Sequence, residues 1–163
     1  MAKLPDFKTI LYATDIGEHT RPVFRSALSI AKKFDSRIIM IHVVEPMSSA
    51  MRAVVDTYLP AGDAKKIHKD GMREVLTKMK ERLQTFCEEE LNTHNLESVH
   101  VKELLVVSGK TSEEIIRAAE NHRADLIIVG KSTRVILGGD VAGSTARRIS
   151  RHSNVPVMIV PNN

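Results

Sequence analysis

The sequence predicts a doubly wound α/β fold, in which helices cover both faces of a parallel five-stranded sheet. Short apolar runs alternate with longer segments whose apolar residues recur every three or four positions, which indicates the order β-α-β-α-β-α-β-α-β. The run 38–44 is almost continuously apolar, as is typical of a strand buried on both faces. We expect the strand order 3-2-1-4-5 and a ligand site at the carboxyl ends of the strands, where that order reverses.

The first predicted strand, 9–13, ends in a polar turn that contains Asp15. A helix follows over about 20–34, because Pro22 is tolerated in a first turn and apolar residues recur at helical spacing. That spacing gives the helix one apolar stripe, which consists of Val23, Ala27, Ile30, Ala31 and Phe34. The second strand is the apolar run 38–44.

Residues 45–62 form the least regular segment, with two prolines and a glycine. Its length suits a lid or an interaction loop. Its apolar residues favour instead a short helix packed on its own domain, and we expect that helix. The next helix covers about 64–92. Its inner stripe is Met72, Leu76, Met79, Leu83, Phe86 and Cys87, so the single cysteine belongs to the core.

The second half of the chain continues the alternation. The third strand covers 99–107, and Thr111-Ser112-Glu113-Glu114 is a capping-box pattern that predicts a helix start. The fourth strand is 126–129. A short helix over 146–152 and a fifth strand over 157–160 complete the predicted fold.

Composition restricts the function classes. At 163 residues the chain is most simply one domain, 1–163. The net charge of +4 and the aromatic content of 4% do not indicate nucleic-acid binding. No apolar run approaches the roughly 20 residues of a membrane span. A single cysteine and a polar start of the sequence predict a cytoplasmic protein.

The strongest candidate for a ligand site is the loop between Gly130 and Gly143. Glycine allows the backbone to approach a ligand, and the N–H groups of the following helix attract anions. The hydroxyls of Ser132, Ser144 and Thr145 add donors for phosphate oxygens. The alternative is an ordinary β-α loop with a capped helix.

No catalytic constellation stands out. The seven histidines are scattered, and none forms a zinc-like cluster with cysteine. His42 lies inside an apolar strand, which favours a satisfied core histidine. Asp15 could hold Mg²⁺ together with phosphates. No clear base activates water, so the protein is more simply a binder than an enzyme.

The motifs together resemble the universal stress protein family over almost the whole chain. They are Lys8–Asp15, Ile41–Val44, Ala124–Gly130 with Gly143-Ser144, and Val155–Val157. The nucleotide-binding branch of that family carries Gly-x2-Gly-x9-Gly-Ser/Thr. This chain keeps the spacing and replaces the middle glycine with Thr133.

The resemblance implies a flavodoxin-like, or Rossmann-like, fold, a homodimer, and ATP or a related adenine nucleotide, with or without Mg²⁺. Asp15 and the backbone of Val43 would then contact the adenine or ribose, and the glycine loop would hold the phosphates. The implied nucleotide-contacting residues are Ala13, Thr14, Asp15, Val43, Val129, Gly130, Ser132, Thr133, Gly143, Ser144 and Thr145.

The substitution at Thr133 has an estimable effect. If the middle position requires a positive φ, a residue other than glycine costs roughly 1–2 kcal/mol. A micromolar complex is worth about 8 kcal/mol, so binding would weaken about tenfold rather than vanish, unless the Thr133 side chain fills the space of the phosphates.

Three hypotheses follow for function. The first is a regulatory stress-response homodimer that binds an adenine nucleotide. The second is a nucleotide-free adaptor that acts through residues 45–62 and the basic residues Arg147, Arg148 and Arg151. The third is a slow adenine-nucleotide hydrolase. In the expected strand order the apolar strand 157–160 is an edge, and an uncharged edge favours pairing with a second copy. The alternative is a monomer in which a terminal tail or residues 45–62 cover this edge.

Overall fold

The structure, a computed structural model, describes residues 4–96, 98–131 and 143–162. Five strands form one sheet: β1 (Thr9–Ala13), β2 (Arg37–Val44), β3 (His100–Ser108), β4 (Leu126–Gly130) and β5 (Val157–Val160). They lie in the order β3-β2-β1-β4-β5, and every neighbouring pair is parallel. The predicted fold class and strand order are confirmed.

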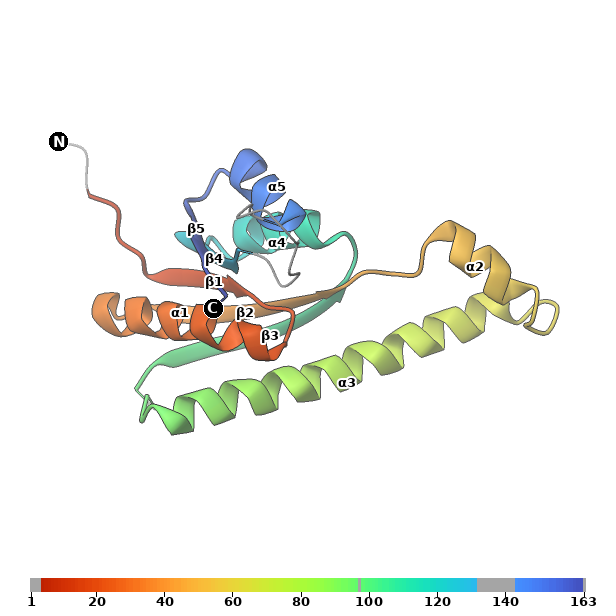
Figure 1. Ribbon diagram of the computed structural model, residues 1–163, viewed down its shortest axis with the longest axis horizontal. Coiled ribbons are helices and arrows are strands. Elements are labelled where there is room, and N and C mark those ends of the chain that lie inside the picture. Colours follow the sequence, from red (N-terminus) through yellow and green to blue (C-terminus); the bar gives the residue numbers. More distant parts are fainter. Residues whose placement is uncertain (1–3, 97, 132–142, 163) are drawn as a thin grey trace.

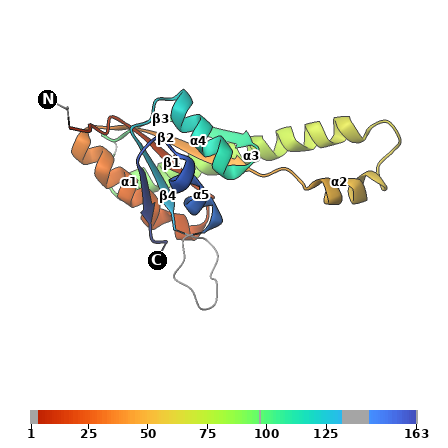
Figure 2. The same cartoon turned by 90° about the horizontal axis from the view of Figure 1, so that it is seen from above.

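Helices cover both faces of this sheet. They are α1 (Arg21–Phe34), α2 (Ser49–Asp56), α3 (Ala64–Thr93), α4 (Thr111–Asn121) and α5 (Ser144–His152), with the 3₁₀ turn η1 (Glu18–Thr20) before α1. Figure 1 shows α1 and α3 below the sheet and α4 and α5 above it. In Figures 1 and 2, α2 and the first part of α3 extend past the carboxyl end of β2, away from the sheet. No helix in the described part of the chain is long and apolar enough to cross a membrane.

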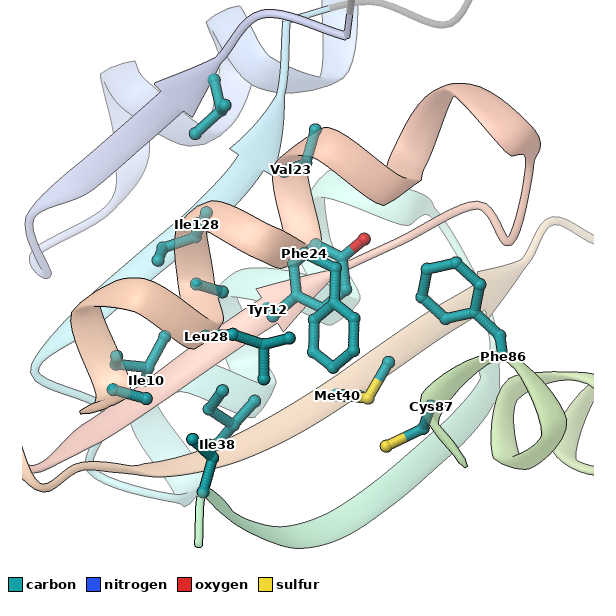
Figure 3. Packing of buried hydrophobic residues seen from close by; sticks show 14 of the residues in the cluster. Ile10, Tyr12, Val23, Phe24, Leu28, Ile38, Met40, Phe86, Cys87 and Ile128 are labelled. Atoms are coloured by element: carbon teal, nitrogen blue, oxygen red, sulfur yellow. The ribbon is translucent and has the colours of Figure 1, made fainter. Parts of the chain in front are cut away.

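Successive residues of each strand point to opposite faces, so the sheet has two apolar cores. On the side of α1 and α3, the rings of Tyr12 and Phe24 stack with centroids 5.0 Å apart, and Met40 and Phe86 belong to the same cluster (Figure 3). On the side of α4 and α5, a second cluster contains Leu11, Ile39, Ile127 and Ile149.

The buried stripe of α1 is wider than the spacing predicted. Phe24 and Leu28 are fully buried, whereas Ile30 is half-buried and Phe34 is 38% exposed. The helix packs on the sheet from its first turn, where Phe24 lies against Tyr12. Phe34 ends the helix and meets Phe7 edge to face at 5.4 Å. Phe34 thus belongs to the predicted apolar stripe but is not buried.

The prediction that the helix within 45–62 packs on its own domain was also wrong. None of the residues of α2 is buried, and Met51 and Val54 are 55% and 56% exposed. The chain leaves β2 beyond the last sheet contact, so α2 has no core face beside it. The Nε2 atom of His68 on α3 lies 2.6 Å from Oδ1 of Asp56 and links the two helices.

The long helix α3 has two different surroundings. Its last third packs on the sheet through Leu83, Phe86 and Cys87, as predicted for these residues. Glu90, 1% exposed, accepts hydrogen bonds from Arg21 (2.5 Å) and Arg25 (3.0 Å) of α1. The predicted stripe residues nearer its start, Met72, Leu76 and Met79, are only half-buried.

Candidate functional site

A cavity of about 530 Å³ lies at the carboxyl edge of the sheet, where β1 and β4 are neighbours. Its size is within the range of roughly 300–1,000 Å³ that is typical of small-molecule sites. Nine of the implied site residues line it: Ala13, Thr14, Asp15, Val43, Val129, Gly130, Gly143, Ser144 and Thr145. The other two, Ser132 and Thr133, lie outside the described residues.

The centre of the cavity is formed by the ends of β1 and β4. Asp15 is exposed two residues after β1, and Gly130 ends β4, so both lie at the same end of the sheet as expected. A Cβ on Gly130 would approach the side-chain amide of Asn162 to 2.6 Å. The absence of a side chain at Gly130 therefore makes room for Asn162, which donates a hydrogen bond to the carbonyl of His19.

One end of the cavity is the start of α5. The N–H group of Gly143 donates to the carbonyl of Lys131 at 2.6 Å, so it is not available to a ligand in this arrangement. The first bond within the helix runs from Arg147 N–H to the Gly143 carbonyl, and the N–H groups of residues 144–146 therefore precede the helical ladder. The first turn of α5 contains no acidic residue, and Lys131 and Arg147 line the cavity beside it. This end is suited to an anion.

The other end of the cavity lies beyond β2. His42 places Nδ1 2.8 Å from the carbonyl oxygen of Thr14, and a carbonyl only accepts, so Nδ1 carries the proton in this contact. The histidine is satisfied, as expected. It is half-buried and lines the cavity rather than lying within a closed core.

Val43 directs its backbone toward this cavity. Residues of a central strand send their N–H and C=O groups alternately to the two neighbouring strands. The carbonyl of Ile41 accepts from Thr14 on the β1 side, and that of Val44 accepts from Gly109 on the β3 side. The backbone N–H and C=O groups of Val43 therefore point to the β1 side. Val43 lies two residues beyond Ile41, which forms the last β1–β2 pair with Ala13.

The start of α4 closes the same end. Oε1 of Glu45 accepts from the Thr111 hydroxyl at 2.7 Å and from the Thr111 N–H at 3.3 Å, and both residues line the cavity. The predicted capping box at 111–114 was wrong, because the N-cap is the extended residue Lys110, which makes no side-chain cap bond. A carboxylate from the end of β2 takes the place of a local cap.

The comparison with known families agrees with this geometry. The model of the universal stress protein family matches residues 6–161. The chain belongs to the universal stress protein family.

Relatives in this family match over most of their length. Universal stress protein MJ0577 of Methanocaldococcus jannaschii is 25% identical over 154 residues, which are 94% of each chain. A universal stress protein of Thermus aquaticus is 27% identical over 154 residues, 94% of this chain and 98% of that one.

Solved structures of universal stress proteins share the fold. The structure of MJ0577 superposes with a TM-score of 0.61 over 96% of both chains, at 25% identity. A universal stress protein in complex with cAMP has a TM-score of 0.58 and 18% identity, over 97% of this chain and 99% of that one.

Several cavity residues of this universal stress protein were missed by the motif analysis. They are Glu45, Thr111, Lys131, Arg147 and Asn162. Glu45 and Lys131 directly follow strands, and Thr111 begins a helix that follows a strand. Listing every polar residue just after a predicted strand would have found these three.

The described residues hold no group of three or more His, Cys, Asp or Glu side chains that could bind a metal ion. Asp15 is one carboxylate in an exposed position. A Mg²⁺ ion at Asp15 would need further oxygen ligands, which the phosphates of a nucleotide would have to supply.

Proposed function

We propose that this universal stress protein binds ATP or a related adenine nucleotide in the cavity and acts as a regulatory protein of the stress response in the cytoplasm. The observation that carries the proposal is the start of α5. One end of a nucleotide-sized cavity is bordered by three backbone N–H groups that precede the helical ladder, by two hydroxyls, and by Lys131 and Arg147. The phosphates bind there, because helix N-termini and cations attract them together.

The nucleoside then extends toward β2. The backbone N–H and C=O groups of Val43 offer one donor and one acceptor, which complement N1 and the amino group of adenine. Asp15 accepts hydrogen bonds from ribose hydroxyls. One solved protein of the same fold holds cAMP, so the fold accommodates an adenine nucleotide. Mg²⁺ enters this proposal only as the ion that accompanies the phosphates.

Two variants at the first position of α5 test the phosphate site by titration calorimetry with ATP. Ser144→Pro removes the N–H and the hydroxyl, and proline is tolerated at a first helical position. Gly143 precedes it with φ −56° and ψ 159°, which a following proline accepts. Ser144→Ala removes only the hydroxyl. We expect Ser144→Pro to bind ATP about tenfold more weakly than Ser144→Ala, as for one lost charge-assisted hydrogen bond.

Both variants should melt at the wild-type temperature within a few degrees, so that a loss of binding is not a loss of folding. Equal affinity of the two variants would exclude the backbone of residue 144 from the site. A wild-type protein that binds no ATP at millimolar concentration would refute the proposed function.

A nucleotide-free adaptor is the second candidate. The exposed Met51 and Val54 of α2 favour it, because a helix without buried residues offers its apolar surface to a partner. Native mass spectrometry of the purified protein separates the two candidates. A retained mass of an adenine nucleotide supports the first, and its absence, together with no binding of added ATP, supports the second.

We propose further that residues 1–163 are one domain and that two copies pair through β5. β5 is an edge strand, and Met158 is 39% exposed. The carbonyls of Pro156 and Val160 accept bonds from the N–H groups of Ile127 and Lys131, so the alternate residue Ile159 directs its N–H to the outer edge. The same strand of a second copy, related by a twofold axis, would satisfy these groups.

Substitution of Ile159 tests the pairing. Ile159→Pro removes an outward donor and leaves the β4–β5 bonds in place, whereas the control Ile159→Val keeps the donor. Light scattering should give about twice 18.2 kDa for the wild type and the control, and about 18.2 kDa for Ile159→Pro. A wild type that is monomeric at tens of micromolar would exclude this dimer.

A further inference from the structure

Hydrogen bonds hold the backbone on both sides of Asp15. The N–H of Thr14 donates to the carbonyl of Ile41 at 2.9 Å, and the N–H of Ile16 donates to the Thr14 hydroxyl at 3.0 Å. The carbonyl of Thr14 accepts from Nδ1 of His42 at 2.8 Å. The peptide group before Asp15 is therefore fixed through its carbonyl, and the peptide group after it is fixed through its N–H.

The side chain of Asp15 is free, unlike the backbone that carries it. It is exposed, lines the cavity, and makes no hydrogen bond or ion pair with the described part of the chain. An ionised carboxylate accepts hydrogen bonds through both oxygens. A free acceptor on a fixed turn meets a donor of the ligand without rearrangement, so binding loses less free energy to the ordering of groups.

The conformation of Ile16 shows that this turn is strained. Its φ is +59°, a left-handed value that is unfavourable for a β-branched side chain. The other described residues with positive φ, apart from glycine, are Asp35, Asn95 and Arg123. Each of these follows the end of a helix, where the left-handed conformation is common. Ile16 instead follows strand β1, so its conformation depends on the bonds around it.

The bond from His42 comes from outside the turn. His42 belongs to β2, is half-buried, and donates from Nδ1 because a carbonyl only accepts. Without this donor the carbonyl of Thr14 loses its partner and gains by rotating toward water. The strain at Ile16 favours such a rotation. Asp15 would then move together with the peptide group that precedes it.

We propose that His42 is a positioning residue for Asp15. It holds the turn in the conformation in which the carboxylate of Asp15 meets the ribose hydroxyls of a bound nucleotide. This inference rests on the proposed nucleotide function. In this role His42 acts through Asp15, so its effect on binding is confined to the contact with the ribose.

Two matched nucleotides isolate the contact at Asp15. ATP and 2′,3′-dideoxy-ATP carry the same base and the same phosphates, and they differ only in the two ribose hydroxyls. Titration calorimetry gives the ratio of their dissociation constants for each variant. A substitution that merely destabilises the fold lowers the folded fraction for both nucleotides alike and leaves this ratio unchanged.

Three substitutions of histidine separate the role of the bond from that of the residue. His42→Leu removes the Nδ1 donor, whereas His42→Asn keeps an N–H donor at the corresponding position. The control is His122→Leu. Nδ1 of His122 lies 2.9 Å from the carbonyl of Ala118, and His122 is half-buried like His42 but is not among the cavity-lining residues. The control therefore removes the same kind of bond outside the site.

We expect wild type to bind ATP about tenfold more tightly than 2′,3′-dideoxy-ATP, as for one hydrogen bond to a charged acceptor. Asp15→Ala should reduce this ratio to about one. His42→Leu should reduce it about threefold or more, because hydrogen bonds weaken steeply when the acceptor is displaced. His42→Asn and His122→Leu should keep the wild-type ratio.

The outcomes separate this inference from the function on which it rests. A ratio that falls in Asp15→Ala but not in His42→Leu would overturn the role of His42 and leave nucleotide binding intact. A ratio that falls as far in His42→Asn or in His122→Leu would do the same, and so would a wild type that binds both nucleotides equally well. A wild type that binds neither nucleotide would overturn the proposed function and this inference with it.

Discussion

The first and last parts of α3 carry the same apolar rhythm in different surroundings. From Leu83 to Glu90 the inner face of the helix is buried against the sheet and α1. From Met72 to Met79 the residues of the same stripe are only half-buried, and Figure 1 shows this part of the helix beyond the sheet. The pattern of apolar residues is thus the same in the last part of α3, which packs on the sheet, and in the first part, which extends beyond it.

This comparison separates two kinds of information in a sequence. A recurrence of apolar residues every three or four positions specifies a helix and the face that is able to pack. The energy of packing also depends on the surface that contacts this face. The sequence of the helix does not encode that surface. The predictions below test whether the two parts of α3 differ in energy as they differ in burial.

The largest difference is expected in thiol reactivity. Cys87 is 5% exposed, and burial raises its pKa to about 11, so both access and the thiolate fraction are low near pH 8. In a Cys87→Ser background, Val75→Cys places a thiol at an exposed position of the same helix. Wild type should react with a disulfide reagent roughly a thousandfold more slowly than this variant, as opening of the core costs about 4 kcal/mol or more. Similar rates would mean that the last turns of α3 open freely.

The second difference concerns deletion of core volume. Leu83 is fully buried, so Leu83→Ala should lower the free energy of unfolding by about 3 kcal/mol. Leu76 is half-buried in the exposed part, and Leu76→Ala should cost less than about 1 kcal/mol. Urea unfolding followed by circular dichroism measures both. Equal losses would indicate that a partner surface covers the first part of α3 in solution.

The third prediction compares two carboxylates. Burial alone would raise the pKa of Glu90, but hydrogen bonds from Arg25 and Arg21 outweigh it and lower that pKa below its usual range. A lowered folded-state pKa stabilises the protein at neutral pH, and this contribution is lost as the pH falls below the unfolded value of about 4.5. Glu90→Gln should cost about 1–2 kcal/mol at pH 7 and less at pH 3.

The matched control for Glu90 is Glu74→Gln. Glu74 pairs with Lys78 at 2.8 Å on the exposed part of α3. Its removal should leave thermal unfolding at pH 7 unchanged, because exposed pairs contribute little. If Glu74→Gln lowered the thermal stability as much as Glu90→Gln, the effect at Glu90 could not be attributed to its bonds between α1 and α3.

The smallest effect is expected at Gly71, inside the exposed part of α3. Among the described residues no atom lies within 4 Å of the position of a Cβ at Gly71, so Gly71→Ala should stabilise the helix by about 0.5–1 kcal/mol. Gly62 has φ +89°, and the control Gly62→Ala should destabilise its turn by about 1 kcal/mol. Amide hydrogen exchange over residues 65–80 measures both. Slower exchange only in Gly71→Ala would show that this part of α3 is helical in solution.

The sequence predicted the strands, their order and the edge of the sheet at which the cavity lies. These follow from local patterns: apolar runs such as 126–129, and turns that end in residues such as Asp15. Nine of the site residues that the family resemblance implied also line the cavity.

The errors concern contacts between residues far apart in the sequence. The cap of α4 is Glu45, 66 residues before Thr111, and no local pattern encodes such a pairing. The hydrogen bond from Gly143 to the Lys131 carbonyl likewise depends on how β4 and α5 meet. The exposure of α2 depends on where the sheet ends, which a short apolar segment cannot indicate.

The bond between the Gly143 N–H and the Lys131 carbonyl has a consequence for evolution and engineering. It joins the two residues that flank 132–142 and so fixes the distance between the end of β4 and the start of α5. Loop-closure entropy changes only slowly with length, and each doubling costs about 0.6 kcal/mol. Closure entropy alone would therefore tolerate a change in the number of residues between Lys131 and Gly143. We expect the Gly-x2-Gly-x9-Gly-Ser/Thr spacing, which this chain keeps, to be a requirement of the ligand site rather than of the fold.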